Sequence, residues 1–283
     1  MKNAKRIFSL LLCAVLVVLC FAGCSKADNK AEEITDKTLI IAYRAEKAPF
    51  IYTDENGELT GFDVELMETI FNDIKNDYKD YAFVQVDEDY KLGEEGAYVD
   101  EEGNAYASYL EVGGLEKNNG TFNEDYSMSN TVIENKVVVL TADDSINSYA
   151  DLSGKRLGVV GEIAKAGLEK NAAVLTGLDR AVNYNDLETA VADLQNGTIN
   201  AIAVDDFTYC PSMPEGLRVL DGMLDKTEYV YGFKKFDWYK DSVNTAIMEL
   251  QDPEYNGADN FTPLVEKYFG YDASNFEYTP KTK

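Results

Sequence analysis

The 283-residue chain contains no histidine and a single tryptophan, and its 26 basic residues are outnumbered by 51 acidic residues. The absence of histidine excludes a Ser-His-Asp triad and a zinc site built on imidazole ligands. The formal net charge of −25 argues against nucleic acid as a partner, because duplex binding depends on a basic surface. A hydrophobic fraction of 45% is nevertheless typical of a globular protein.

No apolar run in the sequence is long enough to span a bilayer, which takes roughly 20 residues. The longest run, Ile7–Ala22, is interrupted only by Ser9 and follows a positively charged start that includes Lys2 and Arg6. This pattern is typical of a signal peptide, which we predict at residues 1–23.

The end of this segment, Phe21-Ala22-Gly23-Cys24, resembles a bacterial lipobox, with Phe in place of the usual Leu at the first position. A lipobox cysteine is diacylated and becomes the new N-terminus, so Cys24 is the predicted lipidation site; the alternative is ordinary signal-peptidase cleavage with Cys24 incidental. Cys210 is then the only thiol of the exported body, which must be stabilised without an internal disulfide. Residues 24–37 are small, polar and charged and predict a linker.

The first part of the body predicts the start of a parallel α/β sheet. Thr38–Tyr43 has the pattern of a short buried strand, and Asp54–Gly57 forms the turn of a hairpin. Asp63 can cap a helix whose apolar positions recur with helical spacing to Ile74. Phe83–Val86 is a second strand.

An acidic, glycine-spaced stretch, Asp87–Gly103, follows this strand. It lacks the alternating oxygen ligands and terminal glutamate of a 12-residue calcium loop, so we predict a solvated insertion rather than a calcium site.

A second α/β unit is predicted from about Ser148 onwards. Asp205-Asp206 stand at the carboxyl end of one of its strands, where open α/β sheets bind ligands. Two neighbouring carboxylates are costly unless solvated or paired, and we expect the site to be solvated in an open form. The elements expected in this part of the chain are strands at Leu157–Val160, Ile199–Val204 and Glu228–Phe233, a helix capped by Asn185 or Asp186 and stopped by Gly197, and two last helices over 242–250 and 261–269.

Four sequence segments carry a family resemblance. They are Ala48-Pro49-Phe50 with Gly61-Phe62-Asp63-Val64-Glu65-Leu66, Asp151-Leu152-Ser153-Gly154-Lys155-Arg156-Leu157-Gly158-Val159, Leu194-Gln195-Asn196-Gly197 with Asn200-Ala201 to Asp205, and Glu266-Lys267-Tyr268-Phe269-Gly270. In this order they resemble family 3 of the bacterial solute-binding proteins, the extracellular receptors of amino-acid ABC importers.

The resemblance implies an α/β, two-lobe fold like that of type II periplasmic binding proteins. Each lobe is an open, mostly parallel sheet flanked by helices, and two crossing strands near Thr141–Asp143 and Tyr229–Gly232 form the hinge. Lobe 1 would be discontinuous, comprising residues 38–141 and 232–283, and lobe 2 would comprise residues 142–231. A ligand that touches both lobes favours the closed form, which a membrane permease would recognise.

The sequence departs from the family where members usually bind the ligand carboxylate. A Thr-x-x-Arg stretch usually precedes an aromatic-Ser pair, which here resembles Tyr126-Ser127, but Lys117 and Gly120 stand in the two places. The chain has no arginine between Arg44 and Arg156. Residues 87–112 also replace a helix and strand that the family usually has in lobe 1.

Two interpretations of the ligand remain. Either Arg44 supplies the carboxylate clamp from another direction, or the ligand lacks an α-carboxylate and Glu162 with Asp205 hold a cation against aromatics such as Phe50. Arg44 could instead be a solvated surface cation, Phe50 a core aromatic, and Glu162 a residue that complements a helix dipole. Asp205 stands where the family's ammonium-binding Asp stands. The predicted ligand-binding residues are Arg44, Lys47, Phe50, Gly114, Glu162 and Asp205.

Three classes of function compete for this fold. The first is a monomeric, lipid-anchored receptor on the outer face of the cytoplasmic membrane, which delivers an amino acid or related amine to an ABC permease. The second is a sensor lipoprotein that reports to a separate membrane receptor. The third is an enzyme, since Glu162 and Asp205 could form an acid–base pair. The partial glycine pattern Gly158-x-x-Gly161 lacks the full dinucleotide fingerprint. We expect the first class, with no catalytic residue, cofactor or metal.

Overall fold

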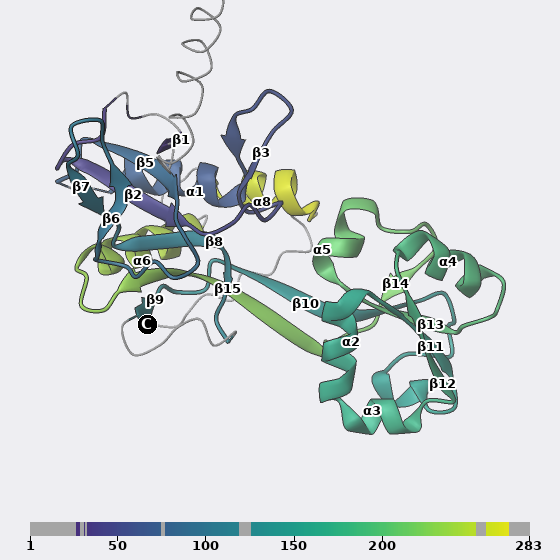
Figure 1. Ribbon diagram of the computed structural model, residues 1–283. Helices are drawn as coiled ribbons and strands as arrows, with labels where there is room; N and C mark the ends of the chain where they lie inside the picture. The colour runs from purple at the N-terminus through teal and green to yellow at the C-terminus, as the bar shows by residue number, and fades with distance from the viewer. Residues whose placement is uncertain are drawn as a thin grey trace, which may run out of the picture.

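The computed structural model describes residues 27–28, 31, 33–74, 77–118, 126–252 and 259–271. The predicted signal peptide, Cys24 and part of the predicted linker lie outside these residues. The described residues form two α/β lobes that are joined by a pair of long strands (Figure 1). Within the described ranges, no helix is both long and apolar enough to cross a membrane.

Lobe 1 is built on a sheet with the strand order β1-β5-β2-β8-β15, and β9 also pairs with β15. Strand β2 runs parallel to β5 and β8, whereas β15 is antiparallel to β8. All six residues of β2 are buried, as its apolar pattern predicts. The strands are β1 (Ala27–Asp28), β2 (Thr38–Tyr43), β5 (Asp80–Gln85), β8 (Leu110–Glu116), β9 (Tyr126–Met128) and β15 (Asp225–Lys234).

Three helices share the lobe 1 core with this sheet: α1 (Phe62–Asp73), α6 (Tyr239–Leu250) and α8 (Thr262–Phe269). The predicted hairpin is present as β3 (Tyr52–Thr53) paired with β4 (Leu59–Thr60). The predicted insertion contains a second hairpin, β6 (Glu95–Val99) and β7 (Ala105–Ala107). It is less solvated than expected, because Leu92 and Ala97 are buried in a core with residues of β2 and β5.

Lobe 2 has a smaller sheet in which β13 (Ala201–Asp205), β11 (Arg156–Val160) and β12 (Arg180–Tyr184) are parallel neighbours. As predicted, Asp186 caps a helix by accepting a hydrogen bond from the backbone N–H of Thr189. The other elements of this lobe are α2 (Gly161–Lys170), α3 (Ala172–Gly177), α4 (Leu187–Gln195), α5 (Asp206–Tyr209), the 3-10 turns η1 (Tyr149–Leu152) and η2 (Cys210–Ser212), and β14 (Arg218–Val219).

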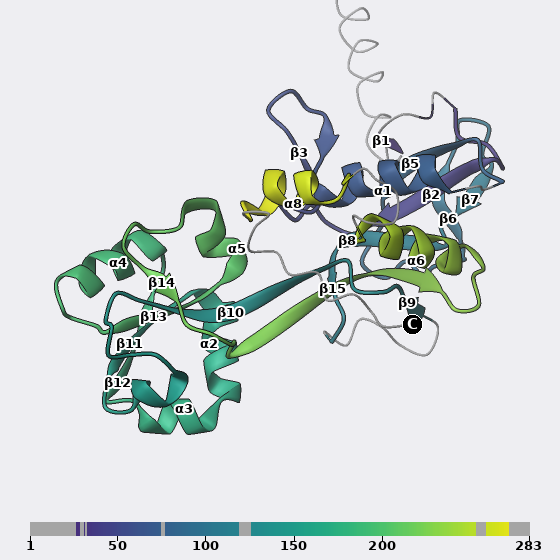
Figure 2. The same cartoon turned by 180° about the vertical axis from the view of Figure 1, so that it is seen from behind.

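Two antiparallel strands, β10 (Ile133–Thr141) and β15, run from one lobe to the other in both views of the molecule (Figures 1 and 2). Ile133 and Tyr229 belong to the core of lobe 1, whereas Val137 belongs to the core of lobe 2. Thr141 lies inside lobe 2, where its hydroxyl donates to the Asn200 carbonyl. We therefore propose that the chain crosses between the lobes at about residues 134–136 and 225–228, earlier in the sequence than expected.

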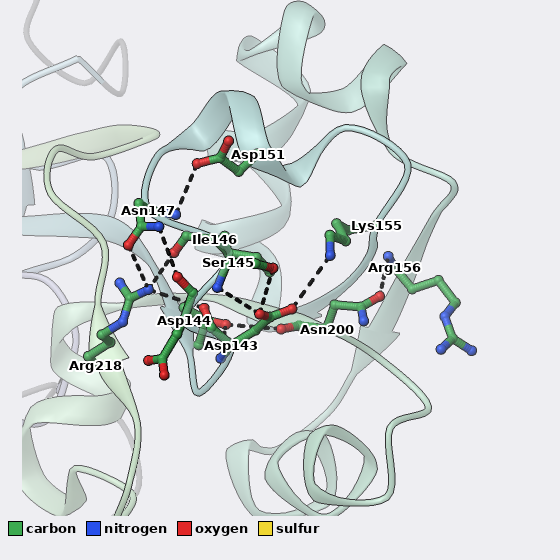
Figure 3. A network of polar contacts seen from close by, with 11 residues as sticks. Asp143, Asp144, Ser145, Ile146, Asn147, Asp151, Lys155, Arg156, Asn200 and Arg218 are labelled. Carbon is green, nitrogen blue, oxygen red and sulfur yellow. Dashed lines mark hydrogen bonds and ion pairs between the residues drawn. The ribbon is translucent and has the colours of Figure 1, made fainter.

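The segment around Asp151-Leu152-Ser153-Gly154-Lys155-Arg156 ties the start of lobe 2 together (Figure 3). The Asp151 carboxylate accepts hydrogen bonds from the backbone N–H groups of Asn147 and Ser148. Lys155 Nζ lies 3.5 Å from the Asp143 carboxylate, and Arg218 donates to the carbonyls of Asp143 and Ile146 (Figure 3). These contacts satisfy the polar groups of the loop that links β10 to β11, so this network has a structural role.

The lobes also meet outside the crossing strands, at an aromatic cluster between α5 and α8. The ring centre of Phe207, from lobe 2, lies 4.3 Å from that of Phe269 and 6.0 Å from that of Phe50, both in lobe 1. Just beyond α8, Tyr271 donates a hydrogen bond of 3.1 Å to the Asp206 carboxylate. A Cβ at Gly270 would lie 2.4 Å from Pro211 Cα, so a glycine is required for this close approach.

Candidate functional site

Arg44 follows the last residue of β2 and has a structural partner. Its guanidinium forms a forked ion pair with Glu111 of β8, with N–O distances of 2.8 and 3.1 Å. The remaining N–H groups donate to the carbonyls of Asp87, Glu88 and Tyr90, and one also reaches the Tyr126 hydroxyl. All donors of the guanidinium are therefore engaged within the protein.

These contacts give Arg44 a role that differs from both interpretations of the sequence. It is neither a solvated surface cation nor a free carboxylate clamp. The Glu111 side chain is only 1% exposed; burial raises its pKa, and the hydrogen bond and charge of Arg44 oppose this shift. Arg44 instead fastens the start of the insertion to the end of the sheet.

Gly113 and Gly114, both with positive φ, form an irregular turn within β8 where the pairing with β15 shifts its register, and Asp63 holds this turn. The Asp63 carboxylate accepts hydrogen bonds of 2.9 Å from both glycine N–H groups and one of 3.2 Å from the Tyr231 hydroxyl. The prediction that Asp63 caps α1 is wrong: the helix begins at Phe62, with Gly61 at the N-cap position and no side-chain cap. Burial raises the pKa of Asp63 to about 6, against the effect of these hydrogen bonds.

Phe50 lies above this turn as a core aromatic. Its side chain is 2% exposed, and its ring packs on Phe62, Phe207, Tyr229 and Phe269. A Cβ at Gly114 would lie 2.5 Å from the Phe50 ring, which explains the glycine. Phe50 therefore supports the residues that line the site and is itself buried behind them.

The ammonium group of Lys47 lies over the rings of Phe50 and Tyr229, which together form an aromatic wall. Its Nζ lies 5.7 Å from the ring centre of Phe50 and 5.3 Å from that of Tyr229, within cation–π range. The ammonium donates a 2.9 Å hydrogen bond to the Gly114 carbonyl and lies 3.5 Å from the Glu116 carboxylate. Its side chain is 43% exposed, so solvent reaches this cation.

Asp205 ends β13 on the lobe 2 side. It is only 5% exposed, so the expectation of a solvated carboxylate is wrong. Asn135 Nδ2 donates to it at 3.0 Å and the Thr208 hydroxyl at 2.8 Å, and these partners offset the cost of burial. The adjacent Asp206 has different partners, the Lys136 backbone N–H and the Tyr271 hydroxyl.

Glu162 belongs to the first turn of α2, where its side chain is 89% exposed and pairs with Lys165 at 3.2 Å. An acid in the first turn complements the helix dipole, which agrees with the structural alternative for this residue.

Two residues that the sequence reasoning missed connect the lobes at this site. Asn135 lies on β10 and is fully buried; its side chain donates to Asp205 and accepts from the Phe207 N–H. Tyr229 lies on β15, and its hydroxyl is hydrogen-bonded to the Asn135 side chain. Asn135 of β10 thus connects Tyr229, whose ring lies beside the Lys47 ammonium, with Asp205. Ile133, Asn135, Val137 and Val139 share one face of β10 by their alternation, and a polar residue on this otherwise apolar face is the signal that could have revealed Asn135.

A cavity of about 410 Å³ opens beside Lys47. Lys47 and Gly114 line it near the aromatic wall, and Arg44, Tyr90, Glu111 and Tyr126 line it near the insertion. All of its lining residues belong to lobe 1, so lobe 2 does not cover the cavity in this conformation. Among the described residues, no group of histidine, cysteine and acidic side chains could hold a metal ion.

Two α/β lobes with a cavity beside the strands that join them are the architecture of two-lobe solute-binding proteins. The family model of the bacterial extracellular solute-binding proteins, family 3, matches residues 39–92. The chain is 28% identical to a probable amino-acid-binding protein of Bacillus subtilis, over 93% of this chain and 94% of that protein. It is 27% identical to a probable histidine-binding protein of Campylobacter jejuni, over 86% of this chain and 90% of that protein.

Solved structures agree on the fold. The L-cystine solute receptor of Neisseria gonorrhoeae, in its unliganded open conformation, matches with a TM-score of 0.62 at 19% identity, covering 84% of this chain and 94% of that one. A polar amino acid uptake protein of Streptococcus thermophilus matches with a TM-score of 0.60 at 21% identity, covering 83% and 87%. The fold is that of a type II periplasmic binding protein, and the chain is similar in sequence to family 3 of the bacterial extracellular solute-binding proteins.

Proposed function

We propose that this protein is the substrate-binding component of an ABC importer and that it captures an amino acid between its lobes. The observation that supports this most directly is the placement of opposite charges at the crossing strands. Lys47 of lobe 1 lies over the Tyr229 ring, and Asp205 of lobe 2 is linked to the same tyrosine through Asn135. A zwitterion placed above Tyr229 and Asn135 would meet a cation and an anion.

Closure of the lobes would then be driven by the ligand. The cavity beside Lys47 is lined by lobe 1 alone, so a solute bound there gains contacts with lobe 2 only when the lobes approach. A ligand with more contacts in the closed form shifts the population toward that form. Closure also excludes water and strengthens charge-assisted hydrogen bonds.

The ligand role of Asp205 can be tested by replacing its charge alone. Asp205→Asn retains the size of the side chain and should weaken binding of the amino acids that bind the wild type by about 100-fold, because the ammonium contact loses its charge. Isothermal titration with the twenty standard amino acids and L-cystine measures this. Glu188→Gln, which neutralises an exposed acid of the same lobe, is the control for net charge and should leave affinity unchanged. Equal affinity of Asp205→Asn and wild type would remove Asp205 from the site.

We also propose that the protein is a monomer held at the outer face of the cytoplasmic membrane by lipid on Cys24. The apolar run before Cys24 and its lipobox-like context support this proposal. In cells that express the full chain, Cys24→Ser should move the protein from the membrane fraction to the soluble fraction. If the variant stays with the membrane, the protein is held there in another way.

A further inference from the structure

Three cations line the cavity: Arg44, Lys47 and Lys91. Lys91 is an exposed residue of the insertion, whereas Arg44 and Lys47 stand beside the sheet and differ in what they can still bind. Arg44 is fully engaged, because its donors are taken by Glu111, Tyr126 and three backbone carbonyls. A ligand carboxylate could bind Arg44 only if the buried Glu111 lost its partner, and an unpaired buried charge is strongly unfavourable. Arg44 is thus excluded as the carboxylate anchor.

Lys47 retains the capacity to bind. Of the three donors of its ammonium, one is used by the Gly114 carbonyl at 2.9 Å and a second only weakly by Glu116 at 3.5 Å. The Glu116 side chain is 42% exposed, and exposed ion pairs of this kind are weak. A carboxylate that arrives from solvent can replace Glu116 without leaving a buried group unpaired.

The position of Lys47 is also fixed before any ligand arrives. The Gly114 carbonyl that receives its hydrogen bond belongs to the turn that Asp63 holds by two N–H groups. The rings of Phe50 and Tyr229 also lie within cation–π range of the ammonium. A positioned donor loses little conformational freedom on binding, which favours affinity.

We infer that Lys47 binds the carboxylate of the captured amino acid, in place of an arginine fork. This inference rests on the proposed function and names the residue that recognises the negative end of the ligand. A lysine is a point charge with rotatable donors rather than a planar fork, so this site recognises the charge of the carboxylate more than its planar geometry.

The experiment compares each amino acid with its own α-carboxamide, which keeps the ammonium and side chain but lacks the negative charge. The probes are the twenty standard amino acids, L-cystine and the α-carboxamide of every one that binds, measured by isothermal titration. Wild-type protein should prefer the acid over the amide by at least about 10-fold, as expected for loss of a charge-assisted hydrogen bond. This comparison needs no variant.

Lys47→Met should reduce affinity for the acid by about 10- to 100-fold and leave affinity for the amide nearly unchanged, so the preference disappears. Lys47→Arg should keep a preference for the acid. Lys79→Met, which removes an exposed lysine just before β5, should behave as wild type.

A Lys47→Met protein that still prefers the acid, or a wild type that binds acid and amide equally, overturns the inference and leaves amino-acid capture intact. If no amino acid in the panel binds the wild type, the proposed function fails and the inference fails with it.

Discussion

Replacing Asp63 by asparagine should make the protein more stable at neutral pH, although Asp63 is buried and hydrogen-bonded. Both glycine N–H groups bond to the same carboxylate oxygen, Oδ2, and the Tyr231 hydroxyl bonds to Oδ1. An asparagine oxygen at the Oδ2 position can accept both N–H groups, and its amide can donate to the Tyr231 oxygen. The two glycine hydrogen bonds are therefore retained and the buried charge is removed, although the Tyr231 hydroxyl changes from donor to acceptor in this pair.

The magnitude follows from the pKa of Asp63, which is raised from 3.8 to about 6. A raised pKa means that the folded state binds the proton more tightly than the unfolded state does. The stabilisation from protonation is fully present below about pH 4 and is lost as the pH rises through about 6. Two pKa units correspond to about 3 kcal/mol, and the favourable position of an acid in the first turn of α1 returns about 0.3–1 kcal/mol of this. The net penalty at pH 8 is about 2–3 kcal/mol.

The free energy of unfolding in urea, followed by circular dichroism between pH 4 and pH 8, measures this effect. Asp63→Asn should match the wild type near pH 4 and exceed it by about 2 kcal/mol at pH 8. Asp143→Asn is the matched control: Asp143 is half-buried and its hydrogen bonds with Ser145 lower its pKa, so this substitution should have the opposite sign. If Asp63→Asn is less stable than wild type at pH 8, the ionised carboxylate contributes more to the turn than its burial costs.

Three further substitutions test the contacts that surround the site. Arg44→Ala should cost about 3–5 kcal/mol, because it leaves Glu111 buried without its partner, and should speed proteolysis in residues 87–92; unchanged cleavage there would show that Arg44 does not hold the insertion. Gly114→Ala should cost about 2–5 kcal/mol in thermal or urea unfolding, through positive φ and collision with the Phe50 ring. Gly57→Ala, which has positive φ but open space around it, should cost only about 1–2 kcal/mol, and equal costs would refute the collision. Tyr271→Phe should destabilise by about 1–2 kcal/mol by removing a hydrogen bond to buried Asp206, and a protein as stable as wild type in urea would show that solvent replaces this bond.

The elements that the sequence predicts well are those whose pattern is set by burial along the chain. The run Thr38–Tyr43 is apolar because both faces of β2 are covered, and Asp186 caps α4 through a bond to a residue three positions away. Such local signals can be recognised in the sequence without knowledge of the fold. The lobe 2 strand that ends at Asp205 is placed by the same kind of signal.

The site itself depends on contacts between residues far apart in the sequence. Arg44 and Glu111 are separated by 67 positions, and Asn135 and Asp205 by 70. Nothing near Arg44 in the chain indicates that a glutamate will engage its guanidinium, and nothing near Asp205 indicates an amide donor. Residue type alone made Arg44 a candidate anchor and Asp205 a solvated acid, and the partners that correct both predictions are brought close only by the folded sheet.

The meeting of Phe207 and Tyr271 with the lobe on the other side has a mechanical consequence. If only the two crossing strands joined the lobes, one lobe could both twist and swing relative to the other. The additional contact between the lobes restricts this motion mainly to one direction. The contact of Phe207 with Phe269 and of Tyr271 with Asp206 would then help to set the direction in which the two lobes approach one another. Substitutions at Gly270 or Tyr271, just after α8, should accordingly alter the relative orientation of the lobes before they alter the affinity for a ligand.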